Sequence, residues 1–288
     1  MTIKRILCHI DGGDDSEATL QTALTVGRDL GACVEVYHVE LDPQYAVPLA
    51  ADGMTATMIE EIVETVEKES SKRAGRARQL YDQLVQHGGV PAIEAGGEVP
   101  PGFAATFRTE RGREHELVAQ RGMLFDLLVL SRRHGEGEPP ATPTLETAIM
   151  ESGRPILVAP QRAPGALGKH IAVAWRATVP GVHALAGAMP LLERAEQATV
   201  ITVDEGHTEA DPGDIVGYLG YHGVRAAGRH VKAGGREAGQ AILEEAASAG
   251  ADMLVMGAYA HSRLRQLILG GVTSTVLRSA SMPLLLAH

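Results

Sequence analysis

The sequence of 288 residues lacks the features of a membrane-spanning, secreted or nucleic-acid-binding protein. It has no apolar run of about 20 residues, which is the length that crosses a bilayer, and no charged-then-apolar leader at its start. We therefore expect a cytoplasmic chain without membrane contact. A formal net charge of −10 and a pI near 5.6 argue against nucleic acid as a partner, because phosphate contacts need clustered lysine and arginine.

Cysteine is also scarce, with only Cys8 and Cys33 in the whole chain. Both lie in or beside expected strands, and we expect buried free thiols rather than a disulfide. No Cys-x-x-Cys pair exists, and the histidines lack the close paired spacing of a zinc site. We therefore expect no metal bound by side chains. The chain also lacks a Gly-x-Ser-x-Gly elbow and a lysine-bearing phosphate loop, so we expect no catalytic residues.

An internal repeat is the largest feature that is present. Five segments of the first half recur in the same order in the second half: residues 4–10 and 169–175, 34–39 and 199–203, 112–114 and 235–237, 126–130 and 252–256, and 154–159 and 282–287. Between the halves, residues 160–168 contain Pro, Gly and small residues without an apolar period, as linkers do. We predict two domains, residues 1–162 and 163–288.

Within each half, short runs rich in Val, Ile and Leu alternate with longer helical patterns, which indicates a parallel sheet covered by helices on both faces. We predict two tandem α/β domains, each a doubly wound, Rossmann-like five-stranded parallel sheet. The second-half strands are expected near 171–175, 199–203, 225–231, 252–256 and 284–287, with helices near 180–196, 212–222, 236–249 and 271–280. In the first half, helices are expected over 17–30 and 56–87.

The segment after the strand at 253–256 is the strongest candidate site. It begins at Gly257, contains the pair Gly270 and Gly271, and continues into a helical pattern from Val272. Glycines at the start of a helix expose several backbone N–H groups, which can surround an anion with help from the helix dipole. Strand-to-helix turns also use glycine for steric reasons alone, so a purely structural role stays open.

This loop resembles that of the universal stress protein family, which reads Gly, two residues, Gly, nine residues, Gly, then Ser or Thr. The spacing from Gly257 to Gly270 fits, but Ala260 replaces the second glycine and Gly271 replaces the hydroxyl residue. The repeat extends the resemblance to nearly the whole chain. It implies tandem domains of the adenine nucleotide alpha hydrolase-like type that bind ATP or ADP, with Mg²⁺ as an optional companion, and at most slow ATP hydrolysis.

The resemblance also implies which residues meet the nucleotide in the second half. Phosphates would lie on the loop and the following helix start, with His261 within reach. Adenine would rest against the ends of the first two strands, residues 174–176 and 202–203, and on the first glycine of the loop. The expected nucleotide-binding residues are Gly257, Ala260, His261, Gly270, Gly271, Val272, Thr273, Arg176 and Val203. Alternatively, His261 is an exposed loop histidine and Arg176 a solvated cation at a strand end.

The first half departs from this pattern. Its corresponding loop, residues 131–143, lacks the glycine spacing and contains three prolines, which have no N–H to donate. Asp11 stands where the family places an acidic adenine contact, so it is a weaker candidate. Its alternative role is to cap the turn before Asp14. We expect residues 41–53 and 96–109 to be irregular surface insertions that could cover a pocket for another small molecule.

Two functions remain open from the sequence. In the first, an adenine nucleotide binds the second half and its occupancy acts as a signal in the stress response. In the second, the chain is a stress-associated interaction scaffold that binds no nucleotide. The resemblance also implies that the last strands, residues 156–159 and 284–287, pair with a counterpart. It leaves two assemblies open, a homodimer or a monomer in which the last strands of the two halves pair with each other.

Overall fold

A computed structural model describes residues 2–45, 55–94, 102–132, 142–165, 167–204, 211–259 and 271–288. The first half contains β1 (Arg5–His9), α1 (Ser16–Leu30), β2 (Cys33–Leu41), a 3-10 turn η1 (Pro43–Tyr45), α2 (Ala56–His87), β3 (Ala104–Gly112), α3 (Glu114–Gly122), β4 (Leu127–Leu130), α4 (Pro143–Glu151) and β5 (Ile156–Val158). The second half contains β6 (His170–Ala174), α5 (Val179–Leu192), β7 (Gln197–Asp204), α6 (Pro212–Tyr221), β8 (Ala226–Lys232), α7 (Ala238–Ser248), β9 (Met253–Gly257), α8 (Val272–Ser279) and β10 (Leu284–Ala287). The alternation of strands and helices confirms the predicted α/β class.

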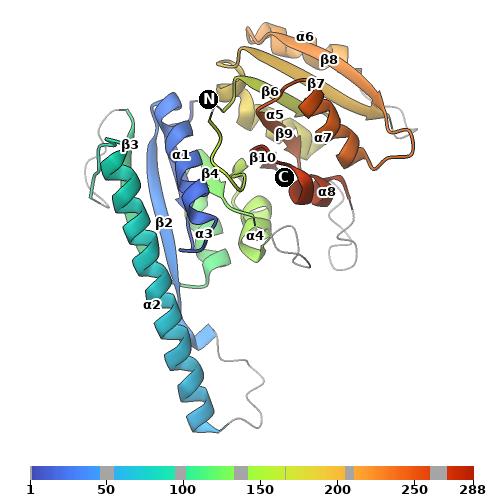
Figure 1. The fold of residues 1–288 in the computed structure, drawn as a ribbon. Coiled ribbons are helices and arrows are strands. Elements are labelled where there is room, and N and C mark those ends of the chain that lie inside the picture. The colour runs from blue at the N-terminus through green and yellow to red at the C-terminus, as the bar shows by residue number, and fades with distance from the viewer. Residues whose placement is uncertain are drawn as a thin grey trace.

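All ten strands form one sheet in the order β3-β2-β1-β4-β5-β10-β9-β6-β7-β8. Each half supplies five parallel strands, and the halves meet where β5 and β10 pair antiparallel, with Leu157 opposite Leu285. Figure 1 shows the two halves side by side around this contact. The pairing of the last strands, which was one of the two assemblies left open, is therefore made within one chain, while a homodimer stays a prediction.

Helices cover both faces of the sheet, and each face has its own apolar core that runs through both halves. One core contains buried residues of α1, α2, α5 and α6, such as Leu20 and Leu192. The other contains buried residues of α3, α4, α7 and α8, such as Ile149 and Leu277. The strand at the junction serves both cores, because Leu157 faces the first and its neighbours Ile156 and Val158 face the second.

Local signals set most helix starts close to the predicted positions. Thr55, Thr142 and Thr178 each occupy an N-cap and accept a hydrogen bond from a backbone N–H of the first turn. Helix α2 has the predicted bounds, and α5 ends at Leu192 rather than residue 196. Cys8 and Cys33 are buried free thiols, as expected. Among the described helices, none is long and apolar enough to cross a membrane.

The expectation of an irregular insertion over residues 96–109 is wrong for its second part. Residues from Ala104 onward form β3, a nine-residue edge strand that pairs with β2 along its whole length. Its buried residues, Ala104 to Thr106, are small, and apart from Phe107 the rest of the strand consists of charged residues, a threonine and a glycine. An edge strand is half solvated, so its sequence does not show the apolar run that marked the inner strands. Likewise, Leu41 ends β2 and residues 43–45 form η1.

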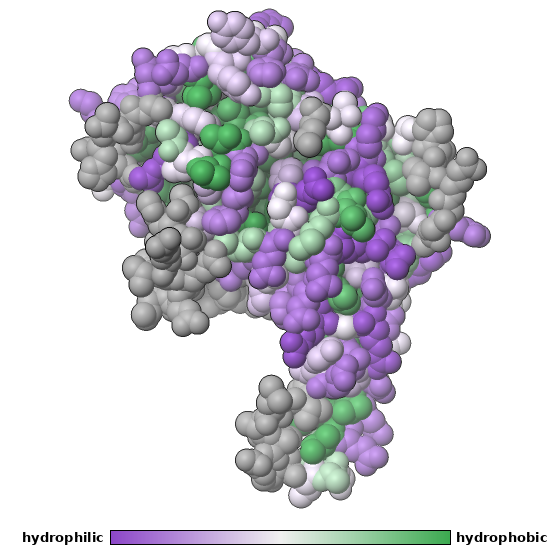
Figure 2. All heavy atoms as spheres, turned by 180° about the vertical axis from the view of Figure 1, so that it is seen from behind, coloured by the Kyte–Doolittle hydropathy of each residue, from purple (hydrophilic) through white to green (hydrophobic). Residues whose placement is uncertain are grey.

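The N-terminal half of α2 projects beyond the rest of the first half, alongside the end of β2 (Figure 1). Only Ala77, Tyr81 and Val85, near its C-terminal end, are buried. Apolar side chains are exposed at the projecting end, which Figure 2 shows from the other side; they include Leu41, Tyr45 and Met58. The charged helix predicted from the sequence is therefore packed against the rest of the first half near its C-terminal end, and its N-terminal part projects into solvent (Figure 1).

Candidate functional site

The site predicted in the second half lies at the carboxyl edge of the sheet between β6 and β9. Chain order reverses there, because β7 and β8 follow β6 on one side while β9 and β10 lie on the other. Ala174 pairs with Met256, so Trp175 and Gly257 come next on neighbouring strands. Open parallel sheets bind ligands at such a switch point. The fold thus brings together the strand ends that the sequence analysis selected.

Gly257 is fixed by packing against α5. A Cβ atom built on Gly257 would lie 2.5 Å from the backbone nitrogen of Gly181 and 2.6 Å from the carbonyl carbon of Pro180. Real Cβ atoms do not approach backbone atoms this closely, and the first turn of a helix cannot rotate away as a side chain can. The first glycine of the motif is therefore required for the strand to lie against the helix, whether or not a ligand is present.

Helix α8 starts directly after Gly271, which occupies its N-cap position. Gly271 is exposed, has an extended φ of 171°, and lacks a side-chain cap. A Cβ atom at this position would meet nothing within 4 Å. The half-buried Val272 and Thr273 form the first turn, where backbone N–H groups have no partner inside the helix. An open helix start of this kind can receive an anion.

Tyr259 connects the end of β9 to this helix, and the sequence analysis missed it. Its backbone N–H donates to Thr273 Oγ1 at 3.5 Å, and its φ of 55° is left-handed. Such a conformation costs a non-glycine residue about 1 kcal/mol, and no local sequence signal marks it. Burial raises the pKa of Tyr259 to about 12, and the charge of Glu146 in the first half acts in the same direction. The phenol is therefore neutral at physiological pH.

Two buried donors near this edge make no hydrogen bond within the described part of the chain. They are the indole Nε1 of Trp175, just beyond β6, and the Oγ of Ser274, in the first turn of α8. Buried polar atoms are normally paired, so each calls for an acceptor from water or a ligand. Trp175 belongs to the predicted adenine-contacting segment, whereas Ser274 was not singled out. Burial in the folded chain, which the sequence does not show, is what distinguishes both.

The remaining predicted residues of the second half differ in their surroundings. Arg176 is exposed, and its carbonyl oxygen accepts a hydrogen bond from the Thr178 N–H at 2.8 Å. Val203 is partly buried against the second core. Its neighbour Thr202 lies within hydrogen-bonding distance of His230, 3.1 Å from Oγ1 to Nδ1. Ala260, His261 and Gly270 lie outside the described residues.

In the first half, Asp11 is engaged in the turn after β1. Its Oδ1 accepts hydrogen bonds from the Gly13 N–H at 2.8 Å and from Ser16 Oγ at 3.1 Å. Burial alone would raise the pKa of Asp11, but the Gly13 hydrogen bond, the charges of His9 and Arg73 and the Ser16 hydrogen bond together lower it. These contacts are those of the alternative role, a turn and helix-start residue.

Helix α2 also covers this turn. Gly12 has a left-handed φ of +77°, and a Cβ atom there would lie 2.3 Å from the Arg73 carbonyl oxygen. The Arg73 side chain reaches Asp11 at 3.5 Å. The carboxyl end of β1 is thus packed against α2, whereas the corresponding helix of the second half, α6, has only ten residues. No cluster of metal-ligating side chains occurs in the described ranges.

Known proteins resemble this chain in sequence and in fold. The model of the universal stress protein family matches residues 222–288, which include β9, Gly271 and α8. Universal stress protein Slr1230 from Synechocystis sp. is 26% identical over 310 aligned positions, which cover 98% of this chain and 99% of that protein. In sequence, this chain is therefore similar to universal stress proteins. The similarity to the Synechocystis protein extends over both repeated halves.

The fold of this chain also resembles solved structures. A universal stress protein from Archaeoglobus fulgidus DSM 4304 matches with a TM-score of 0.67 and 16% identity, over 99% of this chain and 96% of that one. At this identity the similarity concerns the fold.

Proposed function

We propose that this chain is a tandem universal stress protein and that it binds an adenine nucleotide, ATP or ADP, at the carboxyl edge of its second half. Occupancy of the site would act as a signal in the stress response by changing how the protein meets its partners. The observation that carries the proposal is the open start of α8 beside the ends of β6 and β9. Gly271 leaves that start uncovered by any side chain of its own, and unsatisfied first-turn N–H groups attract phosphate oxygens.

The parts of the nucleotide would be divided between the two sides of this edge. The phosphates would accept hydrogen bonds from backbone N–H groups of residues 270–273, as the family resemblance implies. The base would lie toward Trp175, whose buried Nε1 is a donor without a partner in the described chain and whose ring can stack on a purine. Arg176, exposed next to it, can meet either a phosphate or the face of the base.

The second half is the better candidate than the first because of what occupies the corresponding edge. In the first half, Asp11 already accepts hydrogen bonds from its own turn, and Gly12 lies against the backbone of α2. A nucleotide there would have to displace a packed helix. We therefore propose one nucleotide per chain.

The scaffold alternative is favoured by one specific observation. Gly257 is explained completely by its contact with α5, so the first glycine of the motif does not by itself require a ligand. Under this alternative the loop is kept for packing, and the protein would act through its surfaces alone. Direct binding measurements separate the two functions.

The test uses Trp175, which is the single tryptophan of the chain and lies at the proposed base site. ATP with Mg²⁺, or ADP, should change its fluorescence in a saturable way with a micromolar Kd, and calorimetry should give about one site per chain. Gly271→Val should weaken binding by about tenfold or more, because its side chain would crowd the phosphate position. The circular dichroism spectrum of Gly271→Val should match that of the wild type, because no atom lies within 4 Å of a Cβ atom at this position. If nucleotide-stripped protein shows neither a fluorescence change nor heat of binding, nucleotide binding is excluded and the scaffold function is the one that remains.

A gain of affinity is expected for Gly271→Ser. This change restores the hydroxyl that the family carries after the last glycine, in a position where a side chain meets nothing. One added hydrogen bond to a charged phosphate is worth about 1.5 kcal/mol, or about tenfold in Kd. Serine should also cap α8 slightly better than glycine, by a few tenths of a kcal/mol. Gly271→Ala is the control for nucleotide calorimetry; equal affinities of the Ser and Ala variants would contradict the phosphate assignment.

A further inference from the structure

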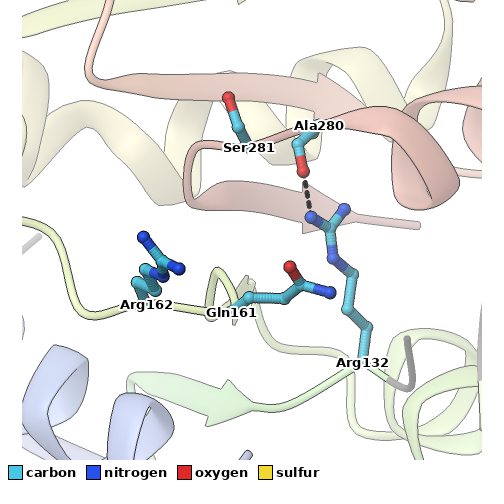
Figure 3. A pocket seen from close by; sticks show the side chains of 5 residues that line it. All are labelled: Arg132, Gln161, Arg162, Ala280 and Ser281. Carbon is cyan, nitrogen blue, oxygen red and sulfur yellow. Dashed lines mark hydrogen bonds between the residues drawn. The ribbon is translucent and has the colours of Figure 1, made fainter. Parts of the chain in front are cut away.

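A cavity lies between the two halves, near the C-terminal end of α8 and away from its start. It has a volume of about 200 Å³ and is lined by Arg132, Gln161, Arg162, Ala280 and Ser281. The first three follow β4 and β5 of the first half, and the last two lie in the turn from α8 to β10 of the second half. Figure 3 shows the Gln161 amide directed toward the Arg132 guanidinium, with Arg162 on the opposite side. The cavity is therefore built from both halves.

The polar groups around this cavity suit an anion. Two guanidinium groups, an amide and a hydroxyl line it, and none of its described lining residues carries a carboxylate, although the chain as a whole has a net charge of −10. Guanidinium groups present paired N–H donors that match the oxygens of carboxylate and phosphate. The local charge is thus opposite in sign to that of the protein.

Arg132 forms the inner wall and is held firmly in place. It is 3% exposed, and its Nη1 and Nη2 donate to the carbonyl oxygens of Leu277 and Ala280 at the end of α8. Burial lowers the pKa of Arg132 to about 10, while the charge of Asp15 acts in the opposite direction. The side chain therefore stays charged at neutral pH. An oriented, buried cation beside a polar cavity is a preorganised electrostatic contact.

The size of the cavity limits what can enter it. Pockets for drug-sized ligands and cofactors occupy roughly 300–1,000 Å³, so the 200 Å³ found here is too small for a nucleotide. Gln161, Arg162 and Ser281 are exposed, so a solvent ion can reach the cavity past flexible side chains. Among the described residues, the Arg162 side chain makes no ion pair that would have to break before it could close over an anion.

We propose that this cavity is a binding site for a small oxyanion, of the size of phosphate or a short carboxylate. Arg132 and Arg162 would supply the charge, and Ser281 would donate a hydrogen bond from the second half. Because the contacts come from both halves, a bound ion would stabilise their junction next to the β5–β10 pairing. This site is independent of the proposed nucleotide site.

The test measures binding of inorganic phosphate and of acetate to the full chain by calorimetry and thermal unfolding, with sodium chloride at matched ionic strength as reference. We expect a saturable rise in Tm with at least one oxyanion but not with chloride. Arg162→Ala and Ser281→Ala, both exposed and not expected to affect folding, should each weaken binding by about fivefold or more. Arg194→Ala, an exposed arginine outside the cavity, should bind as the wild type does.

The outcomes separate this proposal from the nucleotide proposal. If phosphate binds and acetate does not, the ligand is a phosphate-type ion, and the reverse result identifies a carboxylate. Gly271→Val should leave oxyanion binding unchanged, even if it abolishes nucleotide binding. Equal stabilisation by chloride, or unchanged binding in Arg162→Ala, would overturn the site.

Discussion

Gly257→Ala should lower the free energy of unfolding by about 3 kcal/mol, at the upper end of the cost of overpacking. The added methyl group would lie 2.5 Å from the Gly181 nitrogen and 2.6 Å from the Pro180 carbonyl carbon. Both atoms belong to the backbone of the first turn of α5, so neither can move by changing a rotamer. The strand or the helix would have to shift, and β9 lies between β6 and β10 in the sheet. Urea unfolding gives the change from the transition midpoint.

Gly271→Ala is the matched control for this prediction. It changes another glycine of the same motif by the same methyl group, but no atom lies within 4 Å of the new Cβ and the φ of 171° is extended. The free energy of unfolding should fall by less than about 1 kcal/mol, because alanine is a poorer N-cap than glycine. A similar loss of stability in the two variants would show that Gly257 is not held by packing. The pair thus separates the structural glycine of the loop from the one that is free to meet a ligand.

Arg132→Met should destabilise the protein by about 3 kcal/mol. The wild-type guanidinium donates to the carbonyl oxygens of Leu277 and Ala280, and a buried acceptor that loses its partner costs about 1–3 kcal/mol. A cation at the end of a helix also stabilises the helix dipole. Methionine keeps much of the volume, so the loss reports on the hydrogen bonds rather than on a cavity.

The effect of Arg132→Met should appear first in α8. Hydrogen exchange of the α8 amides should accelerate more than that of β1 or β2, because the lost contacts hold the end of this helix against the first half. Arg278→Met is the control: Arg278 is an exposed cation in the last turn of the same helix, and its loss should change stability by about 0.5 kcal/mol or less. If both variants behave alike, Arg132 acts only through its charge and does not connect the halves.

Arg132 also illustrates what a sequence pattern cannot reveal. It lies in the segment that the sequence analysis set aside because its prolines and spacing did not match the motif. Its partners are about 145 residues further along the chain. A contact of that separation leaves no local pattern, because only the folding of both halves brings the two segments together.

The roles of Asp11 and Tyr259 also could not be predicted from the sequence, because both depend on contacts made in the folded chain. For Asp11 the residue type allowed two roles, and hydrogen bonds from Gly13 and Ser16 provide the turn role in the structure. Tyr259 adopts a left-handed conformation that its residue type disfavours, so only tertiary contacts can place it there. Edge strand β3 was missed because half of it faces solvent.

The sequence by itself determined the α/β class, the repeat, the inner strands and the bounds of α2. Each of these depends on apolar periodicity or on residues close in the chain, since buried parallel strands and amphipathic helices must repeat their apolar residues at fixed intervals. Tertiary structure alone decided that the halves share one ten-stranded sheet, that α2 packs against the turn after β1, and that Gly257 lies against α5. These features arise from close approaches between distant segments, where the distance between atoms, rather than the type of residue, sets the energy.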